Sequence, residues 1–164
     1  MEIKTSGVMN GLILAAVISV LTFSSVGCGE KPTREYYKNG QLKGEGVLKE
    51  GVPEGRVKEY YENGKLKAEG VYRNGRQEGP FKYYFENGQL ESELPYKNGK
   101  LEGRFKTYYN NGQLESEVVY RNGRPEGRDK SYYKNGKLKA ESTFKDGKLE
   151  GVVKEYDENG KLKR

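Results

Sequence analysis

The sequence predicts an all-β fold, an elongated single-layer antiparallel β-meander built from hairpin repeats. Three observations predict it: a 24-residue internal repeat, two turn signals in each repeat, and strand-like alternation of side chains between the turns. Because a short repeat buries its apolar side chains only against its neighbours, we expect one continuous sheet.

The repeat covers residues 32–164, which we assign to one repeat domain of five full units and a partial sixth. The aligned unit reads R-F-K-x-Y-Y-x-N-G-x-L-x-x-E-x-x-Y-x-N-G-x-x-E-G. Full units begin at Pro32, Arg56, Pro80, Arg104 and Arg128, and the partial copy runs from Val152 to Arg164.

Each unit carries two turn signals. The first is Asn-Gly at 39–40, 63–64, 87–88, 111–112, 135–136 and 159–160. The second is Glu50-Gly51, then Asn-Gly at 74–75, 98–99 and 122–123, then Asp146-Gly147. Asn-Gly favours the two-residue type I′ turn, in which both central residues have positive φ. We therefore expect about two strands per unit, joined by two-residue turns.

Two-residue turns fix a register for each hairpin. Folding about Asn63-Gly64 places Tyr61 opposite Leu66 and Lys58 opposite Glu69. The same rule pairs Arg34 with Glu45, Lys82 with Glu93, Lys106 with Glu117, and Lys130 with Glu141. Opposite charges directly across from each other favour this register.

The next turn, Asn74-Gly75, places Gly79 opposite Gly70. One face is then expected to carry Tyr37, Tyr61, Phe85, Tyr109, Tyr133, the leucines 42, 66, 90, 114, 138 and 162, and Tyr72, Tyr96, Tyr120 and Phe144. Glycines 55, 79, 103, 127 and 151 would leave room on this face for aromatic rings.

The opposite face is expected to carry the Lys–Glu pairs and a second row of tyrosines, Tyr36, Tyr60, Tyr84, Tyr108, Tyr132 and Tyr156. Tyrosine gives contact area at low entropic cost, so this row is the candidate binding row. The alternative is that these rings only stack on each other and on lysine stems.

Composition limits the chemistry that the chain can perform. Hydrophobic residues make up 33% and charged residues 33%, but 14 tyrosines between Tyr36 and Tyr156 favour a folded chain with a thin core. The chain has no histidine and one cysteine, which excludes zinc sites, Ser-His-Asp or Cys-His catalysis and intrachain disulfides. We expect no catalytic residue, metal or cofactor.

Basic and acidic residues interleave to a net charge of +6, so no long basic run exists to follow a phosphate backbone. We expect no nucleic-acid partner. Lys-Leu-Lys at 65–67, 137–139 and 161–163 leaves weak contact with anionic lipid open.

The first residues are typical of an export signal. Residues 12–23, LILAAVISVLTF, form an apolar run that fits a signal-peptide core. The following Ser25-Val26-Gly27-Cys28 resembles a bacterial lipobox in Gly27 and Cys28, with Ser25 replacing the usual larger aliphatic residue. The resemblance implies a signal peptide at 1–27, a lipidated Cys28 and a short tether at 28–33. An ordinary secretory peptide is the alternative.

A lipidated Cys28 predicts a bacterial cell-envelope protein anchored to the membrane. Gly29 differs from the aspartate that resembles an inner-membrane retention signal, so we expect the outer membrane or cell surface.

The repeat itself resembles the MORN repeat in its bacterial variant form. VYRNGRQEGPFKYYFENGQL at 71–90 and VVYRNGRPEGRDKSYYKNGKL at 118–138 are similar to its Tyr-x-x-Gly pattern with an added YY-x-NG-x-L. The resemblance implies an elongated antiparallel sheet of hairpins used for protein contacts or membrane association.

The leading expectation is a protein-binding or scaffolding platform whose partner is another envelope protein. The alternative is an antitoxin or immunity-like protein that neutralises a toxin, because some bacterial members resemble antitoxins. A glycan-cleaving enzyme is disfavoured because its best candidates, Glu54, Glu78, Glu102, Glu126 and Glu150, follow the repeat instead of breaking it.

Overall fold

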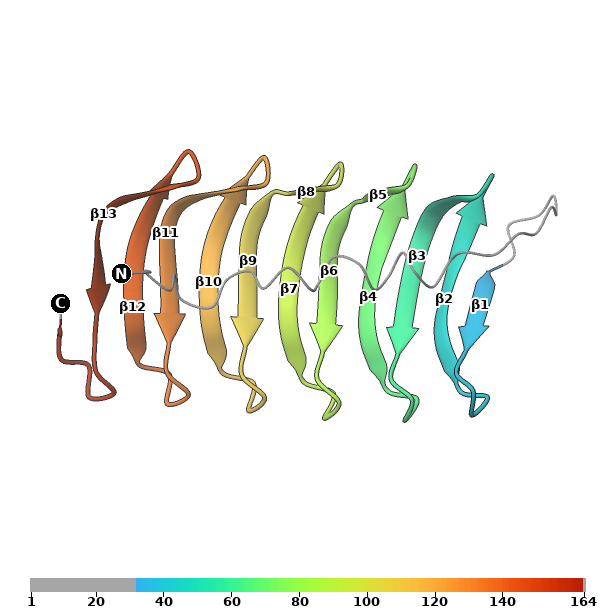
Figure 1. Ribbon diagram of the computed structural model, residues 1–164, viewed down its shortest axis with the longest axis horizontal. Coiled ribbons are helices and arrows are strands. Elements are labelled where there is room, and N and C mark those ends of the chain that lie inside the picture. The colour runs from blue at the N-terminus through green and yellow to red at the C-terminus, as the bar shows by residue number, and fades with distance from the viewer. Residues whose placement is uncertain (1–31, 164) are drawn as a thin grey trace.

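The computed structural model describes residues 32–163, which form one open antiparallel sheet in meander order (Figure 1). The strands are β1 (Thr33–Tyr36), β2 (Leu42–Lys49), β3 (Val52–Tyr60), β4 (Leu66–Arg73), β5 (Arg76–Gln77), β6 (Gly79–Tyr84), β7 (Leu90–Lys97), β8 (Lys100–Leu101), β9 (Gly103–Tyr108), β10 (Leu114–Arg121), β11 (Arg124–Tyr132), β12 (Leu138–Lys145) and β13 (Lys148–Glu155). The predicted all-β meander of hairpins is confirmed. Within these residues no helix is long and apolar enough to cross a membrane.

The sheet has eleven strands side by side, while the two-residue strands β5 and β8 pair only with β4 and β7. Each strand neighbours the strands before and after it, so every repeat contacts only adjacent repeats. The result is an elongated, gently curved single layer (Figure 1).

The second turn of each unit has the predicted geometry. Asn74 has φ 49° and Gly75 has φ 72°, as a type I′ turn requires. Glu50, Asn98, Asn122 and Asp146 share this left-handed conformation at the equivalent position.

The first turn of each unit is longer than predicted. The Gly64 N–H donates to the Tyr61 carbonyl at 2.9 Å, and the Tyr61 N–H donates to the Lys65 carbonyl at 2.8 Å. Gly64 has φ 79°, whereas Asn63 is absent from the residues with positive φ and accepts the Lys65 N–H at 3.0 Å through its side chain. This is a type I turn closed by a glycine bulge, so the expectation of a two-residue turn was wrong here.

The bulge changes the register at the turn end. Lys58 faces Glu69 as predicted, but Leu66 faces Tyr60 instead of Tyr61. Because residues directly opposite share a face, Leu66 lies with Tyr60 and not on the face to which the sequence assigned it.

A second bulge follows each type I′ turn. Tyr72 pairs with Gln77, yet Glu69 pairs with Lys82, so the register shifts by two residues between them. Gly79, with φ 76°, lies in the shifted stretch. The expected Gly79–Gly70 pair is therefore wrong, and Gly79 faces Tyr96.

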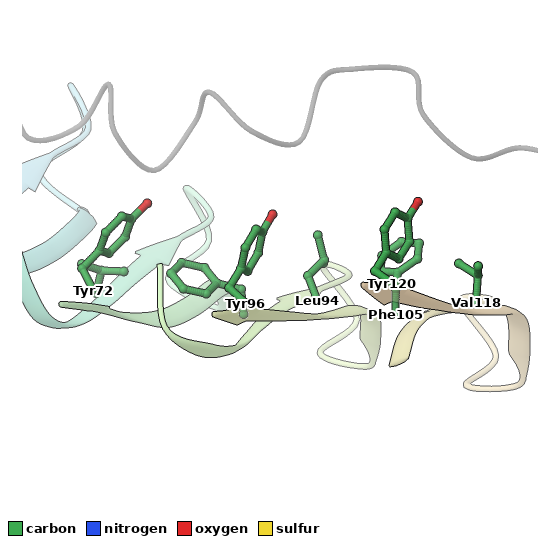
Figure 2. Close-up of a cluster of buried hydrophobic side chains, with 8 residues drawn as sticks. Tyr72, Leu94, Tyr96, Phe105, Val118 and Tyr120 are labelled. Carbon is green, nitrogen blue, oxygen red and sulfur yellow. The ribbon is translucent and has the colours of Figure 1, made fainter. Parts of the chain in front are cut away.

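The core lies on one face of the sheet, which we call the aromatic face. Its buried side chains come from six central strands (Figure 2) and are Val57, Tyr72, Phe81, Leu94, Tyr96, Phe105, Val118 and Tyr120. The sequence placed the three tyrosines on this face. It did not identify the other five residues, which form a row across the middle of the strands. The Phe81 side chain is 1% exposed. Its ring packs edge to face with the rings of Tyr72 and Tyr96, at centroid distances of 5.3 and 5.4 Å.

Gly70, not the predicted glycines, makes room for a ring. A Cβ at Gly70 would lie 2.4 Å from two carbons of the Phe81 ring, whereas a Cβ at Gly55, Gly79, Gly127 or Gly151 would meet nothing within 4 Å. Those bulge glycines serve the backbone turn instead, with φ between 76° and 79°.

Candidate functional site

The face opposite the core carries a continuous row of alternating charges, which we call the charge ladder. Each of its residues lies opposite the next on the neighbouring strand, so the row crosses all eleven strands. Its members are Arg34, Glu45, Lys58, Glu69, Lys82, Glu93, Lys106, Glu117, Lys130, Glu141 and Lys154. The five predicted pairs within hairpins are confirmed. The bulges after the type I′ turns extend the alternation between repeats.

Ion pairs form at the two ends of the charge ladder and at one central position. Arg34 reaches Glu45 at 3.4 Å and Lys154 reaches Glu141 at 3.2 Å, while Glu117 pairs at 2.8 Å with Arg104, which lies outside the ladder. The hydrogen bond from Lys154 lowers the pKa of Glu141. At Glu117 burial raises the pKa, but the hydrogen bond and charge of Arg104 outweigh it, so the pKa is lowered overall. These exposed pairs select register more than they stabilise the sheet.

The predicted tyrosine row lies on this ladder face and is bound to the ladder. The Tyr84 hydroxyl donates to Glu69 at 2.8 Å, and burial followed by this hydrogen bond raises the Tyr84 pKa to about 12. Four of the six hydroxyls of the row bind the glutamate 15 residues earlier in the chain. The equivalent bonds are Tyr60 to Glu45 at 3.2 Å, Tyr132 to Glu117 at 3.3 Å and Tyr156 to Glu141 at 3.2 Å.

Two members of the row depart from this pattern. Tyr36 is 55% exposed on the first strand. Tyr108 would reach Glu93, but within residues 32–163 neither side chain makes a hydrogen bond or ion pair. Burial and then the charge of Glu93 raise the Tyr108 pKa.

A shallow hollow of about 460 Å³ lies beside Glu93, and Tyr108 is not among the residues that line it. Pro80 and Pro95 face each other among its lining residues, where two other units carry arginine and valine, in the pairs Arg56–Val71 and Arg104–Val119. A proline ring is shorter than an arginine side chain, so Pro80 leaves open the space that an arginine would fill. The remaining lining residues are Glu78, Gly79, Glu93, Tyr96, Lys97, Glu102, Arg104 and Lys106.

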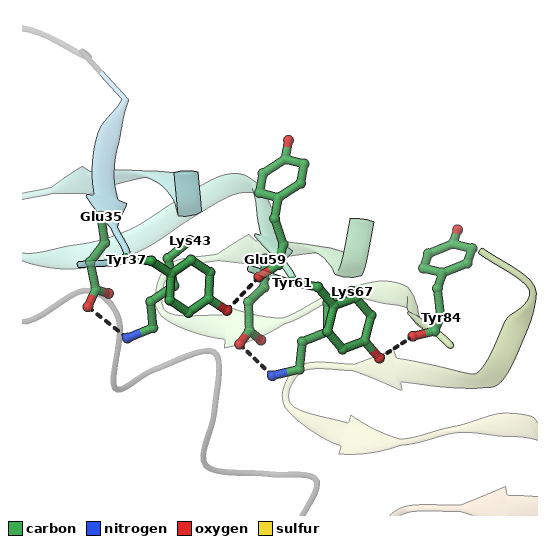
Figure 3. Close-up of polar contacts among 8 residues, drawn as sticks. Glu35, Tyr37, Lys43, Glu59, Tyr61, Lys67 and Tyr84 are labelled. Atoms are coloured by element: carbon green, nitrogen blue, oxygen red, sulfur yellow. Dashed lines mark hydrogen bonds and ion pairs between the residues drawn. The ribbon is translucent and has the colours of Figure 1, made fainter. Parts of the chain in front are cut away.

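In the Tyr-Tyr pairs 36–37, 60–61, 108–109 and 132–133 the second tyrosine has a different role from the first. The Tyr37 hydroxyl donates to the Tyr60 carbonyl at 2.8 Å, and the Tyr61 hydroxyl donates to the Tyr84 carbonyl at 2.7 Å (Figure 3). Tyr109 and Tyr133 repeat this bond at 2.7 Å, and Phe85 has no hydroxyl to do so. These bonds join neighbouring repeats, except the two on either side of Phe85, and were not foreseen.

Ion pairs accompany this tyrosine row in the first two units (Figure 3). Lys67 contacts Glu59 at 2.7 Å and lies 5.9 Å from the centre of the Tyr61 ring. Lys43 repeats the arrangement with Glu35 at 2.8 Å, and the Glu35 hydrogen bond raises the Lys43 pKa. Glu59 is 5% exposed, and a buried carboxylate needs a compensating charge, which Lys67 supplies.

The repeated glutamates before the bulge glycines cap turns. Glu54 accepts the Asn74 N–H at 2.6 Å, and Glu78 accepts the Asn98 N–H at 2.9 Å. Glu102 and Glu126 bind Asn122 and Asp146 in the same way, at 2.7 and 2.8 Å. Their regular spacing therefore has a structural reason.

Two further expectations concern other chemistry. Cys28, the predicted lipidation site, lies outside the described residues, as do the signal peptide at 1–27 and most of the tether. Among the described residues, no cluster of three or more carboxylate, cysteine or histidine side chains could hold a metal ion.

The comparison with known families agrees with this repeat geometry. The MORN repeat variant matches the chain six times, at residues 30–50, 53–74, 77–98, 101–122, 125–146 and 149–164. The starts of the last five matches are 24 residues apart, which is the period read from the sequence. No curated protein matches the chain. The six matches cover most of the sequence, and the chain belongs to the MORN repeat variant family.

Proposed function

We propose that this chain is a protein-binding or scaffolding platform at the bacterial cell envelope, and that a partner protein docks in the hollow on the ladder face. MORN repeats are commonly protein- or membrane-binding, which supports a platform role. The observation that carries the proposal is the hollow beside Glu93. There the repeated hydrogen bond is missing and two prolines open the surface.

The hollow has the composition of a contact site for a protein segment. Pro80 and Pro95 offer an apolar floor, while Glu93 can accept and Lys106 can donate hydrogen bonds at its wall. Glu93 accepts no tyrosine hydroxyl in the described part of the chain, so no such bond has to be broken before it binds a partner. Tyr60, Tyr84, Tyr132 and Tyr156 would each have to release a glutamate, so the row as a whole is a weaker candidate.

The repeat itself supplies the variant that tests the hollow. Pro80→Arg with Pro95→Val restores the residues that the next unit carries at Arg104 and Val119, which also face each other. We expect this double variant to keep its fold, fill the hollow and lose partner capture in crosslinking and pull-down from intact envelopes. Arg128→Pro with Thr143→Pro, at the equivalent facing pair of another unit, is the matched control and should retain capture. Unchanged capture by the filled variant would exclude the hollow.

We further propose that acylated Cys28 holds the platform at the outer membrane or cell surface. Several buried acyl chains give stable anchoring because each buried methylene contributes about 0.8 kcal/mol. The Cys28→Ala variant should lose both its palmitate label and its recovery in the membrane fraction. An antitoxin-like protein acting inside the cell shares the sheet but needs no anchor, so an unlabelled, cytosolic chain would favour that alternative.

A further inference from the structure

The boundaries between neighbouring repeats are built alike, except for the one in the middle of the sheet. At each boundary two strands pair: β2 with β3, β4 with β6, β7 with β9, β10 with β11, and β12 with β13. The boundary between β4 and β6 is the closest reference for that between β7 and β9. Both lie inside the sheet, and each has a two-residue strand, β5 or β8, beside it.

Two tyrosine hydroxyl bonds cross every boundary except that between β7 and β9. Between β4 and β6, the Tyr61 hydroxyl donates to the Tyr84 carbonyl at 2.7 Å, and the Tyr84 hydroxyl donates to Glu69 at 2.8 Å. Between β7 and β9, the first of these donors is replaced by Phe85, which has no hydroxyl. The second is replaced by Tyr108, whose hydroxyl makes no hydrogen bond within residues 32–163.

A backbone donor is also missing at this boundary. Pro80 and Pro95 face each other between β6 and β7, and two prolines have no N–H groups to exchange, so the backbone of Pro95 is directed to the other side of β7. There the Glu102 N–H donates to the Pro95 carbonyl at 2.9 Å. The equivalent Val71 of β4 accepts the Glu78 N–H at the same distance and keeps an N–H of its own.

Ring packing shows the same difference. Tyr72 of β4 packs edge to face with Phe81 of β6, at a centroid distance of 5.3 Å. The equivalent rings of β7 and β9 belong to Tyr96 and Phe105, and in the described part of the chain they form no such pair. Each packs within its own hairpin instead, Tyr96 with Phe81 at 5.4 Å and Phe105 with Tyr120 at 6.1 Å.

We propose that the boundary between β7 and β9 is a weak joint between two more stable parts of the sheet, β1–β8 and β9–β13. The hydrogen bonds between its strands break transiently more often than those of the other inner boundaries, because fewer contacts hold them. The pairing of Glu93 with Lys106 and a 2.9 Å bond from the Asn87 side chain to the Asn110 carbonyl keep the joint closed for most of the time.

The joint passes through the hollow on the ladder face. Glu93 and Pro95 line the hollow from β7, while Arg104 and Lys106 line it from β9. Opening the joint therefore changes the width of the hollow, and a partner that contacts both strands holds the joint closed. This consequence rests on the proposed docking function, whereas the joint itself is a property of the free protein.

Amide hydrogen exchange of the full chain, resolved by residue with NMR spectroscopy, tests the joint. Alternate residues of a strand direct their backbone groups to the same side, so Glu93, like Pro95, exchanges hydrogen bonds with β9, and its partner there is Lys106. Lys82 is the equivalent residue between β4 and β6. Each of the two lysines follows a phenylalanine, so their N–H groups exchange at similar rates in an unfolded chain.

We expect the Lys106 N–H to exchange at least about tenfold faster than that of Lys82. One hydrogen bond shifts an opening equilibrium by roughly fivefold, and several contacts are missing at the joint. Phe85→Tyr supplies a hydroxyl for the Tyr108 carbonyl and does not touch the hollow. It should slow exchange at Lys106 by about fivefold and leave Lys82 unchanged.

Tyr61→Phe is the matched control, because it removes the equivalent hydroxyl between β4 and β6. It should speed exchange at Lys82 by about the same factor and leave Lys106 unchanged. Circular dichroism confirms that both variants remain folded. Equal exchange at the two lysines in the wild type would overturn the proposal, and so would an equal effect of Phe85→Tyr at both. Loss of the docking function with the exchange difference intact would leave the joint supported.

Discussion

Gly70 and Phe81 set how closely side chains pack on the aromatic face. The Phe81 ring covers the place where a Gly70 side chain would lie, and the rings of Tyr72 and Tyr96 pack edge to face with the same ring. Gly70 does not have positive φ, so its backbone would accept any residue. Its requirement for glycine is therefore a matter of space and not of conformation.

Replacing Gly70 with alanine should destabilise the protein by about 1–3 kcal/mol, the usual cost of overpacking. Chemical denaturation monitored by tyrosine fluorescence measures the change. In a Phe81→Ala background the added methyl group has room, so the same substitution should be neutral or slightly stabilising. An equal cost in both backgrounds would show that the ring is not the obstacle.

The tyrosine–glutamate bonds make stability depend on alkaline pH. Burial and the Glu69 bond raise the Tyr84 pKa to about 12, and burial followed by glutamate charge raises the Tyr60 and Tyr132 pKa values. A raised folded-state pKa contributes stability that is complete below the unfolded value, near 10, and is lost as the pH rises towards the folded value. Melting temperatures should therefore fall steeply between about pH 10 and 12.

Tyr84→Phe tests that dependence, since it removes the ionising group and leaves the ring. The variant should lose less stability than the wild type across the same pH interval. Absorbance of tyrosinate, recorded in the same titration, should show that the missing phenol titrates with a midpoint above 10.

At the scale of the element, the two turns of each unit carry the same Asn-Gly signal and fold differently. In Asn74-Gly75 both residues have positive φ, whereas at 63–64 only the glycine does and the turn begins at Tyr61. The strand sequences predicted that a turn occurs and which charges face each other, because both depend on neighbouring residues. The sequence did not separate a two-residue turn from a bulged one, because both place Asn-Gly at the loop.

The core row that contains Val57, Phe81 and Leu94 was also not named from the sequence, because the sequence alone did not reveal the bulges. Its place in the core depends on the bulge at the glycine that follows each turn-capping glutamate, such as Gly79 after Glu78. This bulge brings Phe81 opposite Gly70. Pro80 facing Pro95 was visible in the sequence as a departure from the unit. Only the observed register shows that the two prolines meet and open the hollow.

The glutamate caps give a prediction for the turns. Glu78→Ala leaves the Asn98 N–H without its side-chain acceptor and should cost about 1 kcal/mol in the free energy of unfolding. Glu150→Ala is the matched control, because the described residues contain no following type I′ turn for Glu150 to cap, and it should be close to neutral. Urea denaturation compares them, and equal losses would contradict the capping role.

At the scale of the whole molecule, stability is a sum over neighbouring repeats. Contacts run between adjacent strands and between the turns of adjacent repeats, so no distant part of the chain depends on a particular repeat being present. Each unit also adds one cation and one anion to the charge ladder. Removing a whole unit should therefore preserve the fold, whereas removing half a unit should not.

Deleting residues 77–100 tests this modularity. The deletion removes β6 and β7, joins Arg76 to Leu101 and leaves the charges alternating from Glu69 to Lys106. We expect a cooperative unfolding transition and an unchanged β-sheet signal per residue, with a lower melting temperature. Deleting residues 77–88 removes a single strand and brings Glu69 beside Glu93, so that chain should unfold or aggregate.

The alternating charge ladder also governs how a partner approaches from a distance. Neighbouring charges of opposite sign are about 4.8 Å apart, so their potentials cancel within a comparable distance of the face. A diffusing protein is not steered towards the ladder and senses individual charges only on contact. Association should proceed at the unsteered rate of about 10⁵–10⁶ M⁻¹s⁻¹ and vary little with ionic strength in stopped-flow measurements. Selection among partners then rests on how long each one stays bound.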